Sequence, residues 1–260
     1  MNKEIKVVTF WSHCPGSGAS FTALNAARLL SKKEVKCAVF DFDLIAPSFT
    51  VYFNSKDLMH GIDSLIPYVA GNNLTTEILE GSLQKNGFIN WLCGTGKPEH
   101  SSYFKVEDFS KIIDIAKEVF DVLILDTSGI INNAATYVAI KRADKLFIVT
   151  DKDTVKIRRY NQIKSYIQSE ARNTSIILNT SFDKTVPIEK EEIEDFYGIE
   201  NAFELPNLGP KFVQALNNGK WYEYMEKNKH TANLYNRKLE EIIKKAGIEV
   251  PLQKGGKLFG

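Results

Sequence analysis

Short runs of consecutive apolar residues alternate with segments of helical spacing along almost the whole chain. Unbroken apolar runs are typical of strands buried on both faces, as in parallel sheets that are covered by helices. A repeated strand–helix–strand order gives right-handed crossovers and a layered α/β fold with a mostly parallel sheet. The expected strands are 5–11, 36–42, 88–92, 122–125, 145–150 and 174–178, and the expected helices are 19–30, 109–120, 134–142, 156–169, 189–196, 211–217 and 231–245.

Length and composition fit one globular domain. The chain has 260 residues, of which 43% are hydrophobic, and a formal net charge of +1, so it can bury a full core and extensive disorder is excluded. The near-neutral charge argues against nucleic acid as the obvious ligand. No apolar run has the length of a transmembrane helix, no secretory signal is visible, and the three cysteines form no paired framework. We predict a cytoplasmic protein with one domain over residues 1–247 and a flexible tail over 248–260.

A glycine-rich loop follows the first expected strand and opens the first expected helix. Gly16 and Gly18 allow main-chain N–H groups to turn inward and a phosphate to approach closely. The start of the helix adds the positive end of a dipole. Ser20 stands where a hydroxyl could bind a phosphate-bound Mg²⁺. The same residues also suit an ordinary glycine turn capped by serine, and Ala19 occupies the position of the usual P-loop lysine.

Three aspartates follow expected strands close to this loop. Asp41 and Asp43 end the second expected strand, and Asp126 ends the strand at 122–125. Ligands of such sheets bind at the carboxyl ends of the strands, so these carboxylates are expected near the loop. One aspartate can hold a Mg²⁺-bound water, and a second can orient an attacking water. A single aspartate after a strand is commonly an Asx turn, but the ordered set of three favours a nucleotide site.

Taken together, these motifs resemble those of the ParA/MinD family of deviant P-loop ATPases over most of the chain. CPGSGAS is similar to the family's KGGxGK[ST], DFDLIAPS to its switch I segment, and FDVLILDTSG to its switch II segment. ADKLFIVTDKD, SIILN and ELPNLGPKFVQALNNGK resemble three later family motifs in the same order. The resemblance implies a three-layer P-loop NTPase fold that binds ATP or ADP with Mg²⁺.

The resemblance also implies a role for each matched position. Mg²⁺ would be held by Ser20, with Asp41 and Asp126 behind it, and Asp43 would orient the attacking water if the protein is active. Asn179 would contact the adenine. The positions implied in nucleotide binding are Cys14, Pro15, Gly16, Ser17, Gly18, Ala19, Ser20, Phe21, Asn179, Leu205 and Pro206.

Both lysines of the family loop are missing. The lysine that reaches the partner's nucleotide across a dimer falls on Cys14, and the lysine that holds the β- and γ-phosphates falls on Ala19. Losing one charge-assisted hydrogen bond weakens binding about 10- to 100-fold, whereas cations at a transferring phosphoryl group contribute about 10³–10⁵ in rate. We therefore predict retained or weakened ATP binding with negligible hydrolysis. Four basic residues are candidates to replace a lost cation: His13, Lys152, Arg158 and Arg159.

The resemblance implies a homodimer, with segment 130–142 at its interface, that positions or scaffolds a larger protein machinery. The altered loop most resembles that of the TadZ/CpaE-like branch, which localises pilus or secretion machinery, so a peripheral place at the membrane or cell pole is a further expectation. The tail 254–260 supports binding to a membrane surface only weakly, because it offers little apolar area. A DNA-binding stripe of basic residues is not evident in the sequence, although folding could gather one.

Other functions stay open. One is an active ATPase that partitions plasmids or chromosomes or places the division site, with cations supplied from elsewhere. Another is an interaction scaffold that binds no nucleotide. A tyrosine kinase of related architecture is disfavoured, because the C-terminal sequence has no tyrosine-rich tail. Residues 54–85 carry no recognisable motif, and we expect them to hold a partner-specific surface.

Overall fold

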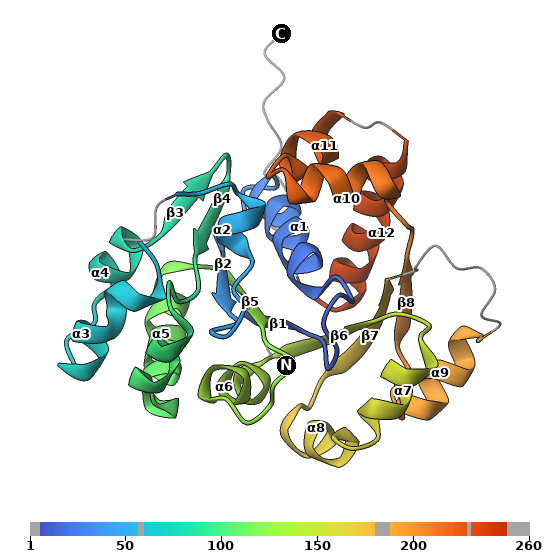
Figure 1. Cartoon of the computed structure of the whole chain (residues 1–260), viewed down its shortest axis with the longest axis horizontal. Coiled ribbons are helices and arrows are strands. Elements are labelled where there is room, and N and C mark those ends of the chain that lie inside the picture. Colours follow the sequence, from blue (N-terminus) through green and yellow to red (C-terminus); the bar gives the residue numbers. More distant parts are fainter. Residues whose placement is uncertain (1–5, 57–59, 180–187, 228–229, 249–260) are drawn as a thin grey trace, which may run out of the picture.

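A computed structural model describes residues 6–56, 60–179, 188–227 and 230–248 of the chain. A central sheet of eight strands has helices on both faces (Figure 1). The strand order is β3-β4-β2-β5-β1-β6-β7-β8, and every neighbouring pair is parallel except β3 with β4. The predicted α/β class and mostly parallel sheet are therefore confirmed. The strands are β1 (Val7–Trp11), β2 (Cys37–Phe42), β3 (Gln84–Asn86), β4 (Ile89–Leu92), β5 (Val122–Thr127), β6 (Lys145–Thr150), β7 (Thr174–Asn179) and β8 (Ala202–Leu205).

The central strands are apolar without alternation because both of their faces are covered. Strands β1, β2, β5 and β6 are buried along their whole length. Successive side chains of a strand point to opposite faces. In β1, Val8 and Phe10 therefore join the core on one side of the sheet, while Val7 and Trp11 join the clusters on the other.

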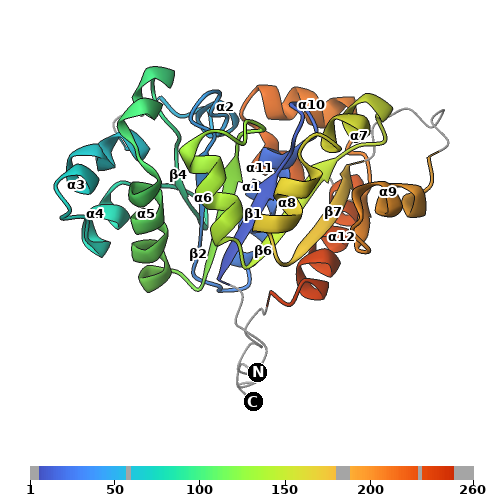
Figure 2. The same cartoon turned by 90° about the horizontal axis from the view of Figure 1, so that it is seen from below.

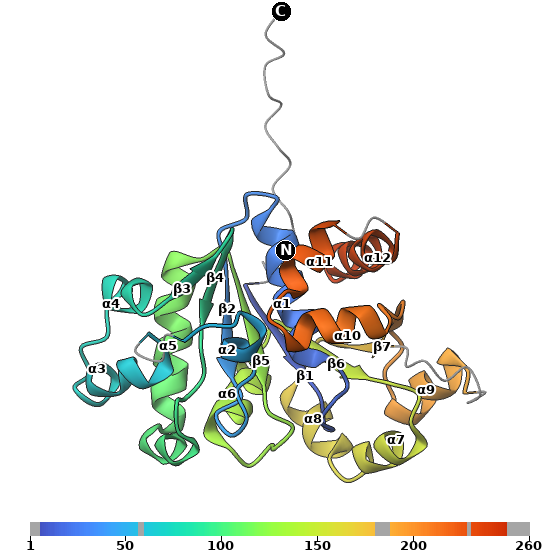
Figure 3. The same cartoon turned by 45° about the horizontal axis from the view of Figure 1, so that its top comes forward.

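One face of the sheet is covered by α1 and the C-terminal helices (Figure 3). The Phe21 ring of α1 lies in this core, with ring centres 4.4 Å from Phe212, 5.8 Å from Trp221 and 5.6 Å from Tyr235. These aromatic contacts fix α1, and with it the loop that precedes α1. The helices of this face are α1 (Ala19–Ser31), α2 (Phe49–Tyr52), α10 (Pro210–Asn217), α11 (Trp221–Lys227) and α12 (Thr231–Lys245).

The other face carries two apolar clusters side by side, with α5, α6 and α8 in front of the sheet in Figure 2. None of the described helices is long and apolar enough to span a membrane. The helices of this face are α3 (Ile66–Ala70), α4 (Thr76–Gly81), α5 (Val106–Val119), α6 (Ala134–Arg142), α7 (Thr154–Tyr160), α8 (Lys164–Glu170) and α9 (Lys190–Tyr197), and 3₁₀ turns cover Ile62–Leu65 and Pro98–Tyr103.

The structure corrects several expected elements. The helix expected over 156–169 is two helices, α7 and α8, because the amides of residues 161–163 bond to carbonyl groups three residues back and tighten the chain. The short edge strands β3 and β8 and the helices α2, α3, α4 and α11 were not predicted, since each covers only three to seven residues. In the predicted tail, Ile248 is buried at 3% exposure, and the rest of the tail lies outside the described residues.

Candidate functional site

The sheet order brings the glycine-rich loop and two of the aspartates together at the carboxyl ends of the central strands. Strand β5 lies between β1 and β2, so Asp126 has a neighbour on each side: Phe10 of β1 and Asp41 of β2 are its register partners. The loop 12–18 continues directly from the end of β1 and leads into α1. This edge is the carboxyl end of the parallel strands, where ligands of such sheets bind.

The loop holds its own shape through two serine hydroxyls. The Ser12 Oγ donates to the Cys14 carbonyl at 2.7 Å and accepts from the Cys14 amide at 3.2 Å. The Ser17 Oγ donates to the same carbonyl at 3.1 Å. Cys14 itself is buried at 2% exposure. None of these bonds involves a lysine, so the fold of the loop is independent of the two missing cations.

Gly16 and Gly18 have the left-handed backbone conformation that favours glycine, with φ of +79° and +85°. A Cβ on Gly18 would collide with the Asn179 side-chain amide, whose Nδ2 donates to the Ser17 carbonyl at 3.0 Å. A Cβ on Gly16 would meet no atom within 4 Å. The loop is therefore packed tightly against Asn179 on one side and open at Gly16 on the other.

Main-chain amides at the loop and at the start of α1 are without protein acceptors. The helix begins after Gly18 with no side-chain cap, and the first N–H groups of a helix have no partner within it. Among the described residues, the amides of Gly16, Ser17 and Gly18 also donate to no protein group. Such a group of unpaired amides at a helix start is suited to an anion.

The Asp126 carboxylate is buried and has no hydrogen bond of ordinary geometry among the described residues. Its exposure is 1%, and neither of its oxygens accepts a hydrogen bond within the described part of the chain. Burial, and then the charge of Asp41, raise the pKa of Asp126 well above its ordinary range. The Ser20 hydroxyl and the Thr127 amide lie close enough to the carboxylate to oppose this rise in its pKa. A divalent cation would supply the missing positive charge. The donor set of Ser20 and Asp126 therefore fits Mg²⁺.

Asp41 is already used to hold the loop that follows β2. Its Oδ1 accepts from the Asp43 amide at 3.1 Å, and its Oδ2 accepts from the amides of Ser48 at 2.9 Å and Phe49 at 3.1 Å. Burial raises the pKa of Asp41 to about 7, although these amides lower it. Asp41 can thus add negative charge behind a cation while it fixes the neighbouring loop.

Asp43 forms the Asx turn that the sequence offered as the alternative to a catalytic role. Its Oδ1 accepts from the amides of Ile45 at 3.1 Å and Ala46 at 3.0 Å. In the described ranges, no group of three or more His, Cys, Asp or Glu side chains could hold a metal ion. A cation at this edge would therefore need further oxygen atoms from its ligand, as a nucleotide phosphate provides.

The remaining predicted residues are placed unevenly. Asn179 reaches the loop, and Pro15 is exposed beside it. The Phe21 side chain and Leu205 lie in the core, so only main-chain atoms of these two residues could face a ligand. Pro206 is half-buried and borders a cavity between β8 and α12. The contact between Asn179 and the loop was not predicted, because it depends on how β7 is aligned with β1.

The candidate replacement cations are engaged elsewhere or exposed. The His13 Nε2 is 2.7 Å from the Lys156 carbonyl, and burial lowers the pKa of His13, so the ring is neutral near pH 7. Lys152 pairs with Glu204 at 3.1 Å. Arg158 and Arg159 are exposed on α7. None of these four side chains provides a fixed positive charge at the loop.

Solved structures of ParA and MinD proteins share this fold. A ParA family ATPase from Chlorobium tepidum superposes with a TM-score of 0.79 at 20% identity and covers 92% of this chain and 98% of its own. MinD from Pyrococcus horikoshii, in complex with Mg-ADP, superposes with a TM-score of 0.77 at 16% identity, and the match covers 95% of this chain and 99% of that chain. A chain of the MinC:MinD cell division protein complex of Aquifex aeolicus superposes with a TM-score of 0.74 at 18% identity, and the match covers 96% of this chain and 100% of that chain. The chain therefore has the fold of the ParA/MinD P-loop ATPases.

Curated relatives in sequence carry a different name. The tyrosine-protein kinase CpsD of Streptococcus pneumoniae is 23% identical over 198 residues, which are 75% of this chain and 83% of the relative. The kinase of the same name from Streptococcus agalactiae is 25% identical over 181 residues, or 68% and 75% of the two chains. No protein-family model matches the chain. The sequence likeness is thus to proteins named tyrosine-protein kinases, the class that the sequence analysis disfavoured.

Proposed function

We propose that this protein binds ATP or ADP with Mg²⁺ at the edge formed by residues 12–20, Asp41 and Asp126, and that it hydrolyses ATP negligibly. The observation that carries the proposal is the buried Asp126 carboxylate, which has no hydrogen bond of ordinary geometry among the described residues, next to an uncapped helix start with unpaired amides. A nucleotide phosphate with its Mg²⁺ satisfies both groups at once, since the phosphate takes the amides and the cation takes the carboxylate.

Binding and turnover have different requirements in this site. The loop is held by Ser12, Ser17 and Asn179, so its amides stay in place without the family lysines. Turnover needs positive charge on the transferring phosphoryl group. His13 is neutral and bonded to a carbonyl, and Lys152 is paired with Glu204. The proposed state is therefore a nucleotide-bound protein that persists instead of cycling rapidly.

The same edge of the sheet carries a candidate dimer face. Ile45, Ile130 and Val155 follow the carboxyl ends of β2, β5 and β6, and they are 42%, 48% and 58% exposed. Exposed apolar side chains grouped at one edge favour association. We propose a homodimer that positions or scaffolds a protein machinery in the cytoplasm or at the cell pole, in the manner of TadZ/CpaE-like proteins. Nucleotide would regulate it by binding dimer and monomer with different affinity.

Thermal unfolding with ATP, ADP and Mg²⁺, paired with a phosphate-release assay, tests the proposal. We expect nucleotide to raise the melting temperature in a Mg²⁺-dependent way while little phosphate is released. Turnover at the rate of an active ParA or MinD protein would establish the active ATPase instead. No shift at saturating nucleotide would establish an interaction scaffold that binds none.

Tyrosine phosphorylation is a second candidate function, because the curated relatives are named tyrosine-protein kinases. A kinase needs the same nucleotide site but an acceptor tyrosine in place of water. Incubation with radiolabelled ATP, followed by phosphoamino-acid analysis of the protein and of an added tyrosine-containing peptide, separates the two. We expect no label on tyrosine, because the loop has neither of the two lysines that would stabilise the transferring phosphoryl group. Labelled phosphotyrosine would establish the kinase.

A further inference from the structure

A buried lysine stands at the other end of the sheet, away from the glycine-rich loop. Lys145 is the first residue of β6 and only 5% exposed. Its Nζ donates to the Asn173 Oδ1 at 2.9 Å and to the Ser175 Oγ at 2.7 Å. Within the described ranges no carboxylate pairs with it. The Nζ also lies over the Phe147 ring, whose centre is 5.4 Å away.

This environment leaves the lysine incompletely satisfied. Lysine is almost never buried without a paired anion, because an ammonium group loses its hydration on burial. An ammonium group has three N–H donors, and only two of them have acceptors among the described residues. Burial accordingly lowers the pKa of Lys145 to about 8. An anion beside the Nζ would supply both the missing acceptor and the missing charge.

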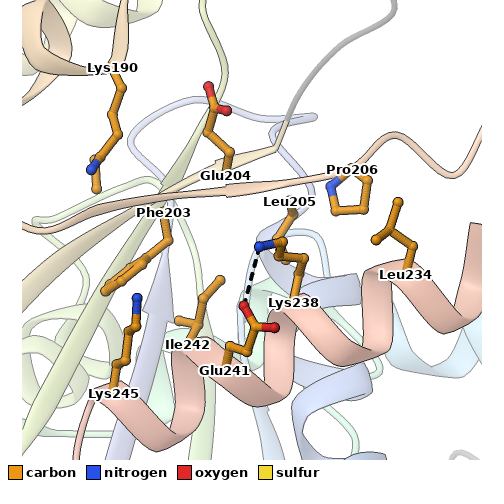
Figure 4. A pocket seen from close by; sticks show the side chains of 11 residues that line it. Lys190, Phe203, Glu204, Leu205, Pro206, Leu234, Lys238, Glu241, Ile242 and Lys245 are labelled. Carbon is orange, nitrogen blue, oxygen red and sulfur yellow. Dashed lines mark hydrogen bonds and ion pairs between the residues drawn. The ribbon is translucent and has the colours of Figure 1, made fainter.

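Two further lysines line the same cavity, which has a volume of about 610 Å³. Lys190 extends from α9 and Lys245 from α12. Figure 4, which draws an adjoining pocket that shares these two lysines, shows Lys245 beside the Phe203 ring and Lys190 on the other side of β8. The Lys245 Nζ lies 5.8 Å from the centre of the Phe203 ring, and the Lys190 Nζ is 3.4 Å from the Glu194 carboxylate. Among the residues that line this lysine cavity, the only carboxylate is Glu200, so positive charge dominates.

We propose that the lysine cavity binds the phosphate group of a phosphorylated small molecule, with Lys145, Lys190 and Lys245 as its cationic ligands. Lys145 and Lys245 have no carboxylate partner among the described residues, and Lys190, although paired with Glu194, adds a third ammonium group to the lining. Such a lining suits an anion that carries two charges and several acceptor oxygens. Asn173 and Ser175 supply polar groups at the inner wall, and Phe203 supplies an apolar surface. A volume of about 610 Å³ lies in the range of small-molecule sites.

The cavity is distinct from the nucleotide site and does not depend on it. It opens at the starts of β6, β7 and β8 and at the end of α12, whereas the glycine-rich loop follows the end of β1. A local probe at Lys145 therefore reports on the cavity even if phosphate also binds at the loop. The proposal can fail while the nucleotide proposal holds, and the reverse.

Lysine-selective ¹³C NMR of the full chain tests the proposal directly. The Lys145 ε-carbon signal, identified by its loss in Lys145→Met, is followed against pH with and without inorganic phosphate or pyrophosphate. Phosphate that binds the charged lysine raises its pKa by about one unit at ten times the dissociation constant. We expect this rise for Lys145, with a dissociation constant on the order of 1 mM or below. An unchanged Lys145 titration in both anions would overturn the proposal.

Variants separate the cavity from general charge effects. Lys245→Gln changes an exposed lysine on α12, so folding is preserved, and we expect it to weaken phosphate binding about tenfold or more. Lys33→Met is the matched control, because Lys33 is paired with Glu240 outside the cavity, and binding should be unchanged. Equal losses in both variants would overturn the proposal. Duplex DNA that binds, and does so less tightly in Lys245→Gln, would identify a nucleic-acid surface instead.

Discussion

Replacing Asp126 with asparagine tests the proposed cation site, because the change removes a buried charge and keeps the shape of the side chain. Asp126 is 1% exposed, and its oxygens accept no hydrogen bond within the described residues. An unsatisfied buried polar group costs about 1–3 kcal/mol, and a charged one more. We therefore expect Asp126→Asn to stabilise the ligand-free protein by about 2 kcal/mol. For a chain of this size that is a rise in melting temperature of about 4–8 °C.

The stabilisation by Asp126→Asn should depend on pH. Folding raises the pKa of Asp126, so the folded state holds the carboxyl proton more tightly than the unfolded state does. The contribution of Asp126 to the free energy of unfolding is therefore greatest below the ordinary carboxyl pKa, and it is lost as the pH rises toward the raised pKa. The stability advantage of Asp126→Asn should therefore grow as the pH rises above the ordinary carboxyl pKa of about 3.9. Asp195→Asn is the matched control, since Asp195 is exposed on α9, and should change little.

Mg²⁺ supplies the second half of the assay. In the wild type, differential scanning fluorimetry should show that Mg²⁺ adds to the stabilisation by ATP. In Asp126→Asn this added stabilisation should disappear, because the carboxylate that neutralises the cation is gone. A variant that melts at or below the wild-type temperature, and still gains the full Mg²⁺ effect, would refute the assignment of Asp126 as a cation ligand.

Three further predictions concern the loop and the lysine cavity. Gly18→Ala should destabilise the protein by about 1–3 kcal/mol in urea unfolding, because the φ of Gly18 is +85° and a Cβ there would meet Asn179. Gly81→Ala, on the open surface of a helix, is the control and should be neutral or slightly stabilising. Equal effects of the two substitutions would contradict this account of the loop. Ala19→Lys should tighten ATP binding about 10- to 100-fold by calorimetry, and no gain would mean that the loop cannot place a lysine on the phosphates. The free energy of unfolding of the wild type should rise by about 1–2 kcal/mol from pH 8 toward pH 10 relative to that of Lys145→Met, because burial lowers the pKa of Lys145 to about 8. The rise is limited because water in the cavity screens part of the charge. Parallel pH curves for the two proteins would show that Lys145 titrates normally.

The parts of the fold that could be predicted from sequence are those set by local pattern. The apolar runs gave the long strands, and parallel pairing then placed Asp41 beside Asp126. Gly16 and Gly18 adopt the positive φ that their residue type suggested. Short edge strands such as β8 carry too few residues for a pattern, so their place depends on tertiary contacts.

Side-chain partners across distant strands could not be predicted. The bond from Asn179 to the Ser17 carbonyl joins residues 162 positions apart, and the Lys145 contacts depend on the alignment of β6 with β7. His13 follows a strand in a polar-looking loop, yet its half-buried ring contacts the aromatic rings of Tyr160 on α7 and Tyr197 on α9. These features decide which cations are available at the loop, and they become visible only in the folded chain.

A crystal structure of the wild-type protein grown with Mg²⁺ and a non-hydrolysable ATP analogue tests the central claim most directly. We predict phosphate oxygens within hydrogen-bond distance of the amides between Gly16 and Ser20, and a cation between the Ser20 hydroxyl and the Asp126 carboxylate. Ordered crystals at saturating analogue that show no nucleotide on these amides would contradict the account.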